Sequence, residues 1–417
     1  MKVVVVGQGY VGLPVAVYAV GAGFDVVGYD TDVRRVKRLN AGESIVDDIS
    51  DDDLRAAIAS GRYRASNQPA DLSGFDVAVI SVPTPLRDGA PDMSHIEEAA
   101  TTLGAHLSRG SCVILESTTY PGTTEELVAP LLESGSGLTA GADFMLGYSP
   151  ERIDPGNRVY TLRTTPKVVS GIDDASLRAV RSFYDAFVDV TVPVASTRVA
   201  ELTKLLENTF RHVNIALVNE VAMFANDLGI DVWEVLSAAD TKPFGYLRFT
   251  PGPGVGGHCL PIDPSYLSWR VRRSLGQPFR FVELANDINE HMPDYVLRRL
   301  VLAFNRRGLP VRGQRVLVLG MAYKKNTGDA RESPSLEVLR QLVTMGADVA
   351  VADPFVEDRF VPSDVERVDC TPEEIAAADA VVVLVDHDAF DYDALVSAEY
   401  VFDCQHRVAP GPNVEYL

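Results

Sequence analysis

Short apolar runs separated by helical patterns dominate the first half of the chain. The strand-like runs are Val3–Val6, Val26–Tyr29, Val77–Val82, Val113–Leu115, Met145–Gly147 and Lys167–Ser170. These runs are continuous and rich in β-branched residues, which is typical of a parallel sheet that is buried on both faces. The pattern predicts a doubly wound α/β domain over residues 1–193.

The periodicity changes near Ser196. Apolar residues then recur at three- or four-residue steps as far as Gly229, which predicts a long amphipathic helix, and a second helix is expected over Asp231–Ala239. The segment Thr241–Pro264 is rich in Gly and Pro and is expected to be irregular.

A second α/β block opens at Arg315. Its expected strands are Val316–Leu319, Val349–Ala352, Val381–Val385 and Tyr400–Phe402. The predicted fold therefore has two Rossmann-like, doubly wound α/β domains joined by an all-helical centre with a long helix. The expected domains are residues 1–193 (the first α/β domain), 194–300 (helical) and 301–417 (the second α/β domain).

The composition of the chain limits the classes of partner that it is expected to bind. The 417 residues carry a formal net charge of −20, which argues against non-specific binding to nucleic acid or anionic membranes. The four cysteines lie far apart without metal-ligand spacing, so neither a metal site nor a disulfide framework is expected. No apolar stretch reaches the roughly 20 residues of a membrane span, and the first strand begins too early for a signal peptide. These features predict a cytoplasmic protein.

A glycine loop directly follows the first predicted strand and opens a helix. Its residues are Gly7-Gln8-Gly9-Tyr10-Val11-Gly12. Gly7 permits the tight turn, Gly9 lets the backbone approach a pyrophosphate, and Gly12 lets helix and strand pack closely. Asp30 ends the second strand, where a carboxylate binds the ribose hydroxyls of NAD and repels the 2′-phosphate of NADP. Arg34 and Arg35 lie close enough in sequence to weaken that preference.

Two further loops follow strands that are expected to meet the cofactor. They are Ser81–Pro85, with Pro83 and Thr84, and Glu116–Thr123, with Thr118. Ligands of open α/β sheets bind at such carboxyl ends. The alternative is that both segments are only proline-stiffened turns.

The segment Pro251–Pro264 contains Gly256, Gly257, His258, Cys259 and Asp263. A single Cys is often just a small buried residue, but its glycine-rich surroundings are unlike a core segment. On the long helix, Glu201, Lys204, Asn208 and Arg211 form a polar stripe. This stripe is either a solvated face or part of a site, and the poor helix former Asn208 favours a site.

Together these motifs resemble the UDP-glucose/GDP-mannose dehydrogenase family over nearly the whole chain. The matching pieces are the glycine loop with Asp30, Pro83-Thr84-Pro85, Glu116-Ser117-Thr118, Ser149-Pro150-Glu151-Arg152, Lys204 with Asn208, Gly256–Cys259 with Asp263, and Gly320, Lys324, Asp329 and Arg331. The resemblance implies an NAD-dependent nucleotide-sugar 6-dehydrogenase that uses two NAD per substrate and forms a thiohemiacetal and then a thioester on Cys259.

The resemblance also implies roles for the other residues. Lys204 and Asn208 would stabilise negative charge on the C6 oxygen, Asp263 and Thr118 would hold a water, and Glu151 would position substrate or activate the hydrolytic water. Lys204 would also lower the pKa of the Cys259 thiol. The implied cofactor residues are Gly7, Gly9, Tyr10, Val11, Gly12, Asp30, Arg35, Pro83, Thr84, Thr118 and Arg331. The implied substrate residues are Glu151, Arg152, Lys204, Asn208, Arg211, Phe249, Gly256 and Lys324. The long helix would form a dimer, so the resemblance implies a homodimer or a higher homo-oligomer.

Within the family, the runs Lys204–Arg211 and Thr241–Gly245 look most like the branch that acts on UDP-N-acetylhexosamines. Ile262 stands where the UDP-glucose branch usually has Lys, and Pro155 stands where it has a second Glu. UDP-glucose and dTDP-glucose remain alternative substrates. A 3-hydroxy acid dehydrogenase, which needs no Cys, and a dinucleotide sensor without activity are the more distant alternatives.

Overall fold

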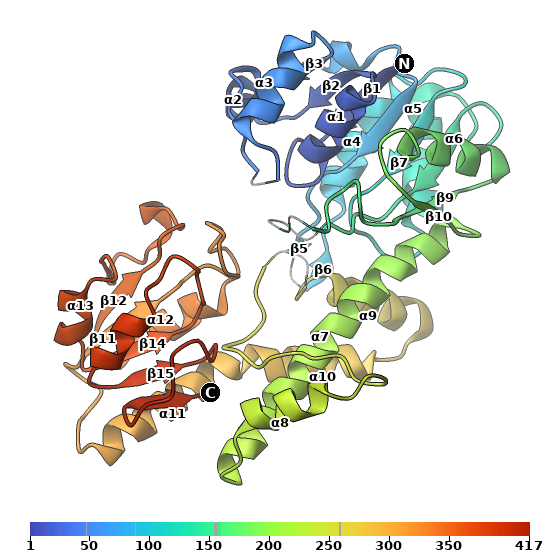
Figure 1. Ribbon diagram of the computed structural model, residues 1–417. Coiled ribbons are helices and arrows are strands. Elements are labelled where there is room, and N and C mark those ends of the chain that lie inside the picture. Colours follow the sequence, from blue (N-terminus) through green and yellow to red (C-terminus); the bar gives the residue numbers. More distant parts are fainter. Residues whose placement is uncertain (47, 88, 154–156, 158, 258–259) are drawn as a thin grey trace. The chain divides into compact units, whose positions relative to one another are not determined.

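The computed structural model describes residues 1–46, 48–87, 89–153, 157, 159–257 and 260–417. The chain forms two compact units (Figure 1). The first unit comprises Met1–Glu207 and Ser265–Gly276, and the second comprises Asn208–Pro264 and Gln277–Leu417. The three domain boundaries expected from the sequence stay a prediction.

In the described part of the first unit, one sheet holds eight strands in the order β10-β9-β8-β7-β4-β1-β2-β3. The strands are β1 (Lys2–Val6), β2 (Asp25–Tyr29), β3 (Tyr63–Ser66), β4 (Val77–Ile80), β7 (Cys112–Leu115), β8 (Met145–Tyr148), β9 (Lys167–Gly171) and β10 (Thr191–Pro193). The six predicted strands are confirmed, although β4 ends two residues early. The sequence did not predict the outer strands β3 and β10, because they lack a continuous apolar run.

Strands β9 and β10 run in the direction opposite to the other strands of this sheet. The other strand pairs of this sheet are parallel, but β9 runs antiparallel to β8, with Tyr148 opposite Ser170. The sequence pattern predicted parallel strands throughout, and for this pair it is wrong. A strand that is buried on both faces has the same apolar pattern in either direction. The reversal places the first residue of β9, Lys167, beyond the carboxyl end of β8.

Helices cover both faces of this sheet, as a doubly wound fold requires. Val3 and Val5 of β1 share one core cluster with Leu13 of α1 and Phe183 of α6. Val4, which points to the opposite face, is also fully buried. The first six helices of the chain lie in this unit: α1 (Gly12–Gly21), α2 (Val33–Asn40), α3 (Asp51–Ala59), α4 (Ser94–Gly104), α5 (Ala129–Ser136) and α6 (Asp174–Tyr184). The small elements are the hairpin β5 (Leu86–Arg87) and β6 (Ala90–Pro91) and the helical turns η1 (Pro69–Leu72) and η2 (Thr124–Val128).

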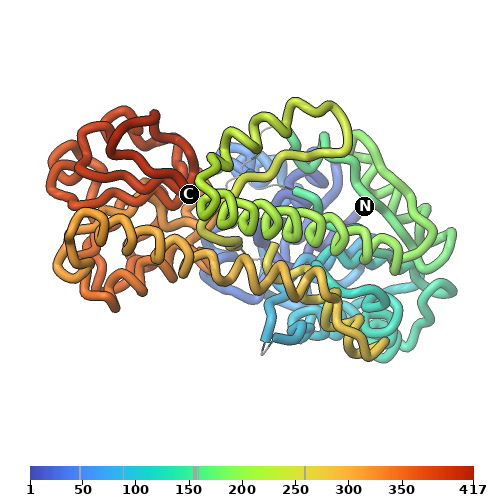
Figure 2. The backbone as a smooth tube through the Cα atoms, turned by 90° about the horizontal axis from the view of Figure 1, so that it is seen from below, coloured from blue at the N-terminus to red at the C-terminus, as the bar shows by residue number. Residues whose placement is uncertain are grey.

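The predicted long helix is confirmed as α7 (Thr197–Asp227), which runs unbroken for 31 residues (Figure 2). The second predicted helix is α8 (Val232–Asp240), whose N-terminus is capped by the Asp231 side chain. The irregular segment ends sooner than expected, because α9 (Asp263–Leu275) begins at Asp263. Pro264 is compatible with this start, since the N–H that proline lacks has no helical partner in a first turn.

The second unit contains a parallel sheet with the order β13-β12-β11-β14-β15-β16 among its described residues. Its strands are β11 (Arg315–Leu319), β12 (Asp348–Ala352), β13 (Glu366–Arg367), β14 (Ala380–Val383), β15 (Val401–Asp403) and β16 (Val414–Tyr416). Its other helices are α10 (Arg280–Glu290), α11 (Met292–Arg306), α12 (Pro334–Thr344) and α13 (Pro372–Ala377), with turns η3 (Asp358–Phe360) and η4 (Asp393–Ser397). The four predicted strands are present, and the outer strands β13 and β16 were not predicted.

Candidate active site

The glycine loop has the geometry of a phosphate-binding turn. Gly7 has φ of 91°, and a Cβ on Gly7 would lie 2.4 Å from the Ser81 carbonyl oxygen. A Cβ on Gly12 would lie 1.8 Å from the Gly7 carbonyl oxygen, so α1 packs directly on the turn. A Cβ on Gly9 would meet no atom within 4 Å. The backbone at Gly9 is therefore open to a ligand, at the N-terminal end of α1 where a pyrophosphate binds.

Asp30 lies buried beside this loop at the end of β2. One oxygen, Oδ2, accepts hydrogen bonds from the Gln8 backbone N–H at 2.9 Å and from Arg35 at 2.8 Å. The other, Oδ1, accepts the Asp32 backbone N–H at 2.9 Å. A carboxylate has about four acceptor sites, so Asp30 keeps capacity for a ribose hydroxyl. Arg35 pairs with Asp30, whereas the Arg34 side chain is 92% exposed.

The two other predicted cofactor loops are tied together at the same sheet edge. Ser117 donates a hydrogen bond to the Val82 carbonyl oxygen at 2.9 Å. The buried Tyr266 hydroxyl on α9 donates to the Thr84 carbonyl oxygen at 2.8 Å. Strands β7, β4, β1 and β2 are successive neighbours in the sheet, so the loops with Thr118, Pro83 and Asp30 follow adjacent carboxyl ends. Tyr266 was not predicted, because an aromatic residue at helical spacing is indistinguishable from core.

Lys204 on α7 and Glu151 lie together in the first unit. The Lys204 ammonium donates to the Glu151 carbonyl oxygen at 2.8 Å and lies 3.7 Å from a carboxylate oxygen of the same residue. Burial raises the pKa of Glu151, while the positive charge of Lys204 opposes that rise. Arg152 pairs with Glu207 at 2.8 Å and donates to the Pro166 carbonyl oxygen at 2.6 Å. Two predicted site residues thus form one buried pair.

Glu201, one turn before Lys204, holds the loop that follows Thr118. Its carboxylate accepts the backbone N–H groups of Gly122 at 2.6 Å and Thr124 at 2.9 Å, and also the Thr124 hydroxyl at 2.7 Å. Burial raises the pKa of this carboxyl. Glu201 was noticed in the polar stripe of α7 but was not proposed as a site residue.

In α7 some polar residues are buried and some large apolar residues are exposed, which is the opposite of the usual arrangement in an amphipathic helix. The polar residues Glu201 and Lys204 are buried, whereas apolar Leu206 is 62% exposed and Leu217 is 55% exposed. The interpretation of the polar stripe as a solvated face is wrong for Glu201 and Lys204, and it holds only for Arg211, which is exposed.

In the second unit, the structure brings Asn208 and Asp263 together. The Asn208 amide donates to an Asp263 carboxylate oxygen at 2.5 Å. Asp263 is buried at the first position of α9. Cys259 and His258, like Pro155, lie outside the described residues.

The remaining predicted substrate residues lie on three segments of the second unit. A Cβ on Gly256 would lie 2.6 Å from the Glu332 carbonyl oxygen, so glycine permits close packing of these two segments. The neighbouring Arg331 pairs with Asp329 at 2.8 Å. Lys324 is half-buried on the loop after β11, and the Phe249 ring lies 5.9 Å from the Phe210 ring.

A buried Asp–His pair holds the start of the loop with Lys324. Asp353 accepts the backbone N–H of Met321 at 2.8 Å and a hydrogen bond from His387 at 3.0 Å, and the other ring nitrogen of His387 accepts the Asn326 N–H at 2.9 Å. Burial alone raises the pKa of Asp353, but the His387 and backbone hydrogen bonds outweigh it and lower the pKa to about 2. Sequence reasoning missed both residues, since they follow separate strands.

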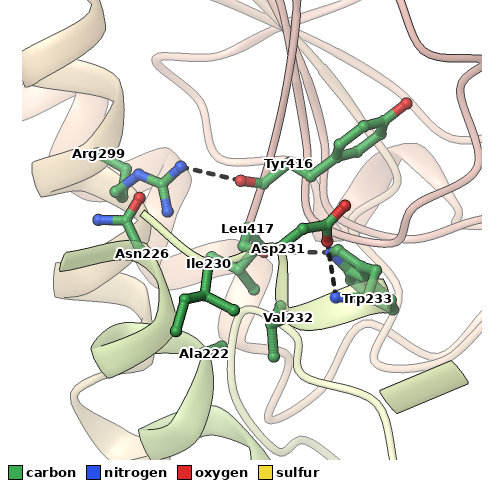
Figure 3. Close-up of a pocket in the computed structure, with 9 residues that line it drawn as sticks. All are labelled: Ala222, Asn226, Ile230, Asp231, Val232, Trp233, Arg299, Tyr416 and Leu417. Atoms are coloured by element: carbon green, nitrogen blue, oxygen red, sulfur yellow. Dashed lines mark hydrogen bonds between the residues drawn. The ribbon is translucent and has the colours of Figure 1, made fainter. Parts of the chain in front are cut away.

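A cavity of about 180 Å³ in the second unit lies apart from these predicted residues (Figure 3). Trp233 donates to the Leu417 carbonyl oxygen at 3.1 Å, and Arg299 donates to the Tyr416 carbonyl oxygen at 2.9 Å. These bonds join the last strand to α8 and α11, so the cavity is a gap in the packing between these elements.

In the described ranges, no helix is both long and apolar enough to cross a membrane.

The doubly wound fold, the open glycine turn and the buried Asp30 define an NAD-binding protein of the Rossmann type. Models of three domains of the UDP-glucose/GDP-mannose dehydrogenase family match in order: the NAD binding domain at residues 1–188, the central domain at 198–291 and the UDP binding domain at 317–410.

Two relatives are similar over almost their whole length. A UDP-N-acetyl-D-mannosamine dehydrogenase from Pyrococcus horikoshii is 36% identical over 94% of this chain and 90% of its own. A UDP-N-acetyl-D-glucosamine 6-dehydrogenase from Salmonella typhi is 35% identical over 94% of this chain and 91% of its own.

Solved structures of nucleotide-sugar dehydrogenases have the same fold as this chain. A UDP-D-ManNAc dehydrogenase from Pyrococcus horikoshii has a TM-score of 0.91 at 33% identity and covers 100% of this chain and 98% of its own. A UDP-glucose dehydrogenase from Pyrobaculum islandicum has a TM-score of 0.87 at 30% identity and covers 100% of this chain and 96% of its own. The chain therefore belongs to the UDP-glucose/GDP-mannose dehydrogenase family and is an NAD-dependent nucleotide-sugar 6-dehydrogenase.

The more distant alternative, a 3-hydroxy acid dehydrogenase, shares only the fold. A 3-hydroxyisobutyrate dehydrogenase from Mycobacterium tuberculosis has a TM-score of 0.51 at 16% identity and covers 69% of this chain and 91% of its own. The match to the UDP binding domain at residues 317–410 separates this chain from that class.

Proposed function

We propose that this dehydrogenase oxidises the C6 alcohol of a UDP-N-acetylhexosamine to the carboxylate. The observation that carries the proposal is the pairing of polar side chains along α7, where Lys204 meets Glu151 and Asn208 meets Asp263. Lys204 and Asn208 are four residues apart on one helix and therefore project from the same face. Two hydrogen-bond donors on one face are suited to stabilising negative charge that develops on an alcohol oxygen.

The oxidation proceeds through the aldehyde. When bound at the glycine loop and Asp30, NAD would supply the hydride acceptor for each of the two oxidation steps at C6. The Cys259 thiolate adds to the aldehyde carbon and forms a thiohemiacetal, whose oxidation leaves a thioester on the same sulfur. Water then adds to the thioester carbon, the C–S bond breaks, and the carboxylate and the free thiol are released. Covalent capture on Cys259 prevents escape of the reactive aldehyde.

Each paired side chain has a place in these steps. Lys204 and Asn208 donate to the C6 oxygen, and one such donor contributes about 3–4 kcal/mol of transition-state stabilisation. Glu151 accepts a proton from the hydrolytic water. Since burial raises the pKa of Glu151, its carboxylate is a stronger base than an exposed glutamate. Asp263, which accepts a hydrogen bond from Asn208, holds a water that receives the first alcohol proton.

The choice of an acetamido sugar rests on the residues near the Cys loop and on the relatives. Ile262 and the run Thr241–Gly245 match the acetamido branch, and both curated relatives described above are named for UDP-N-acetylhexosamines. A pocket that admits an acetamide does not strongly reject a hydroxyl, since a missing small group typically costs only ~1–3 kcal/mol. UDP-glucose is therefore a weaker substrate of the same pocket.

A panel of nucleotide sugars tests this proposal. UDP-N-acetylglucosamine, UDP-N-acetylmannosamine, UDP-glucose and dTDP-glucose are each incubated with NAD, and NADH is measured by absorbance against acid product. We expect two NADH per acid with at least one acetamido sugar. Turnover of a glucose nucleotide alone contradicts the sugar assignment, and one NADH per product contradicts the four-electron reaction.

We also propose that the enzyme is a cytoplasmic homodimer. The exposed apolar residues of α7, which include Leu206, Phe210 and Leu217, suit burial against a second copy. Three described cysteines, Cys112, Cys370 and Cys404, are free, as is usual in a reducing compartment. Light scattering tests the dimer: Leu206→Glu with Leu217→Glu is expected to give a monomer, and an unchanged dimer contradicts the assignment of α7.

A further inference from the structure

The first unit contains a buried ion pair that the proposed chemistry does not use. The Lys167 ammonium donates to a Glu116 carboxylate oxygen, and the two side chains are 3% and 0% exposed. The Tyr184 hydroxyl donates to the other Glu116 oxygen at 2.9 Å, and Lys167 lies 5.0 Å from the centre of the Tyr184 ring. Lys167 also donates to the Pro150 carbonyl oxygen at 3.1 Å.

The reversed strand explains why this pair lies at the ligand-binding edge of the sheet. Glu116 directly follows β7 and so lies at the carboxyl end of a strand. Because β9 runs antiparallel to β8, its first residue, Lys167, reaches the same edge. A parallel β9 would place Lys167 at the opposite edge. The antiparallel direction of β9 thus places the Lys167 ammonium beside the segment Ser149–Arg152, which follows β8.

Two ammonium groups hold consecutive carbonyl oxygens at this segment. Lys167 binds the carbonyl of Pro150 and Lys204 binds the carbonyl of Glu151. The peptide that carries Glu151 is therefore fixed from both β9 and α7. Burying a salt bridge gains little stability over an apolar pair, because desolvation of the charges offsets their attraction. Stability alone is thus a weak reason for a charged pair at this position.

We propose that Lys167, fixed by Glu116 and Tyr184, is a positioning residue that clamps the Pro150–Glu151 segment and so holds Glu151 in place for the hydrolysis step. This inference rests on the proposed role of Glu151 as the base of the hydrolysis step. Lys167 touches neither substrate nor cofactor in this scheme and acts only through Glu151.

The charges around Glu151 predict the direction in which each substitution shifts its pKa. Burial raises the pKa of Glu151; Lys204 on α7 and Lys167 on β9 lower it, and Glu116 after β7 raises it. The loss of Lys167 therefore shifts the Glu151 titration upward, and the loss of the Glu116 charge shifts it downward. A pair that served only the fold would shift the Glu151 titration in the same way, but the acidic limb of the kcat profile would not move with it.

The test compares Lys167→Met, Glu116→Gln and a control, Arg163→Met, in the full chain. Arg163 also belongs to the first unit but forms an exposed pair with Asp189 at 3.1 Å. Infrared pH-difference spectra follow the ionisation of Glu151, with Glu151→Gln as the blank, so this readout requires no turnover. A neighbouring charge shifts a pKa by about one unit or more, and we expect about one unit upward for Lys167→Met, a smaller downward shift for Glu116→Gln and none for Arg163→Met.

Steady-state kinetics provide a second readout. For Lys167→Met we expect kcat to fall roughly tenfold or more, as for a displaced catalytic group, while KM for the nucleotide sugar changes little and the acidic limb of the kcat profile moves with Glu151. If Lys167→Met does not fold, the double variant Lys167→Met/Glu116→Gln removes both buried charges and is expected to shift Glu151 upward by less. Any of three results overturns the inference: shifts in one direction for Lys167→Met and Glu116→Gln, no shift in either, or an acidic limb that does not move with Glu151. Wild-type protein that oxidises no nucleotide sugar overturns the proposed function instead, and the infrared titration then still tests whether Lys167 shifts the pKa of Glu151.

Discussion

Replacing Gly12 by alanine is expected to damage both folding and NAD binding. The added Cβ would lie 1.8 Å from the Gly7 carbonyl oxygen and 2.4 Å from the Ser81 hydroxyl oxygen. Contacts between real Cβ atoms and other heavy atoms essentially never fall below 3.0 Å, so α1 and the glycine turn must separate by at least 1.2 Å. Overpacking of this kind typically costs about 1–3 kcal/mol. The backbone N–H groups that face the pyrophosphate move with α1, so NAD binding weakens, and a misplacement of about 1 Å can lower the reaction rate by about 100-fold.

The matched control is Gly9→Ala, because a Cβ at Gly9 meets no atom within 4 Å. We expect Gly9→Ala to keep the thermal unfolding midpoint of the wild type and to weaken NAD binding, since the methyl group occupies the ligand side of the turn. Gly12→Ala is expected to lower both the midpoint and the NAD affinity. Calorimetric unfolding and NAD titration separate the two variants. A Gly12→Ala protein with wild-type midpoint and wild-type NAD affinity would refute the packing argument.

Three further outcomes are expected. Cys259→Ser should nearly abolish acid production while NAD affinity stays within a few-fold, and near-normal acid production would contradict covalent catalysis. Asp30 should enforce NAD by repelling a 2′-phosphate, so kcat/KM with NADP should be far below that with NAD; comparable values would mean that Arg35 dominates. The pKa of Asp353 is lowered to about 2 in the folded protein, from about 3.9 in the unfolded chain. Ionised Asp353 therefore stabilises the fold above about pH 4. This contribution is lost as the pH falls through about 2. The difference in unfolding midpoint between wild type and Asp353→Asn should therefore shrink from pH 6 to pH 2, and a difference that does not depend on pH would contradict this cause.

Much of the fold was predictable, because its signals are local. The six inner strands of the first sheet, the four predicted strands of the second, and helices α7 and α8 follow from apolar runs and periodicity of neighbouring residues. The cofactor turn is equally local, since Gly7, Gly9 and Gly12 are constrained by the backbone within a few residues. The grouping of the other candidate residues came from a resemblance to a family, because no spacing along the chain places Glu151 beside Lys204.

The sequence by itself determined where the inner strands of both sheets and the helices α7 and α8 lie, how the glycine turn is built, and that α7 has one polar and one apolar face. Only the tertiary structure decided which face of α7 is covered, and it buries Glu201 and Lys204 while Leu206 is exposed. It also decided the direction of β9, which places Lys167 beside Glu116. The physical reason is the same in both cases: a periodic pattern distinguishes the sides of an element, but its direction and its covered side depend on the partners it packs against.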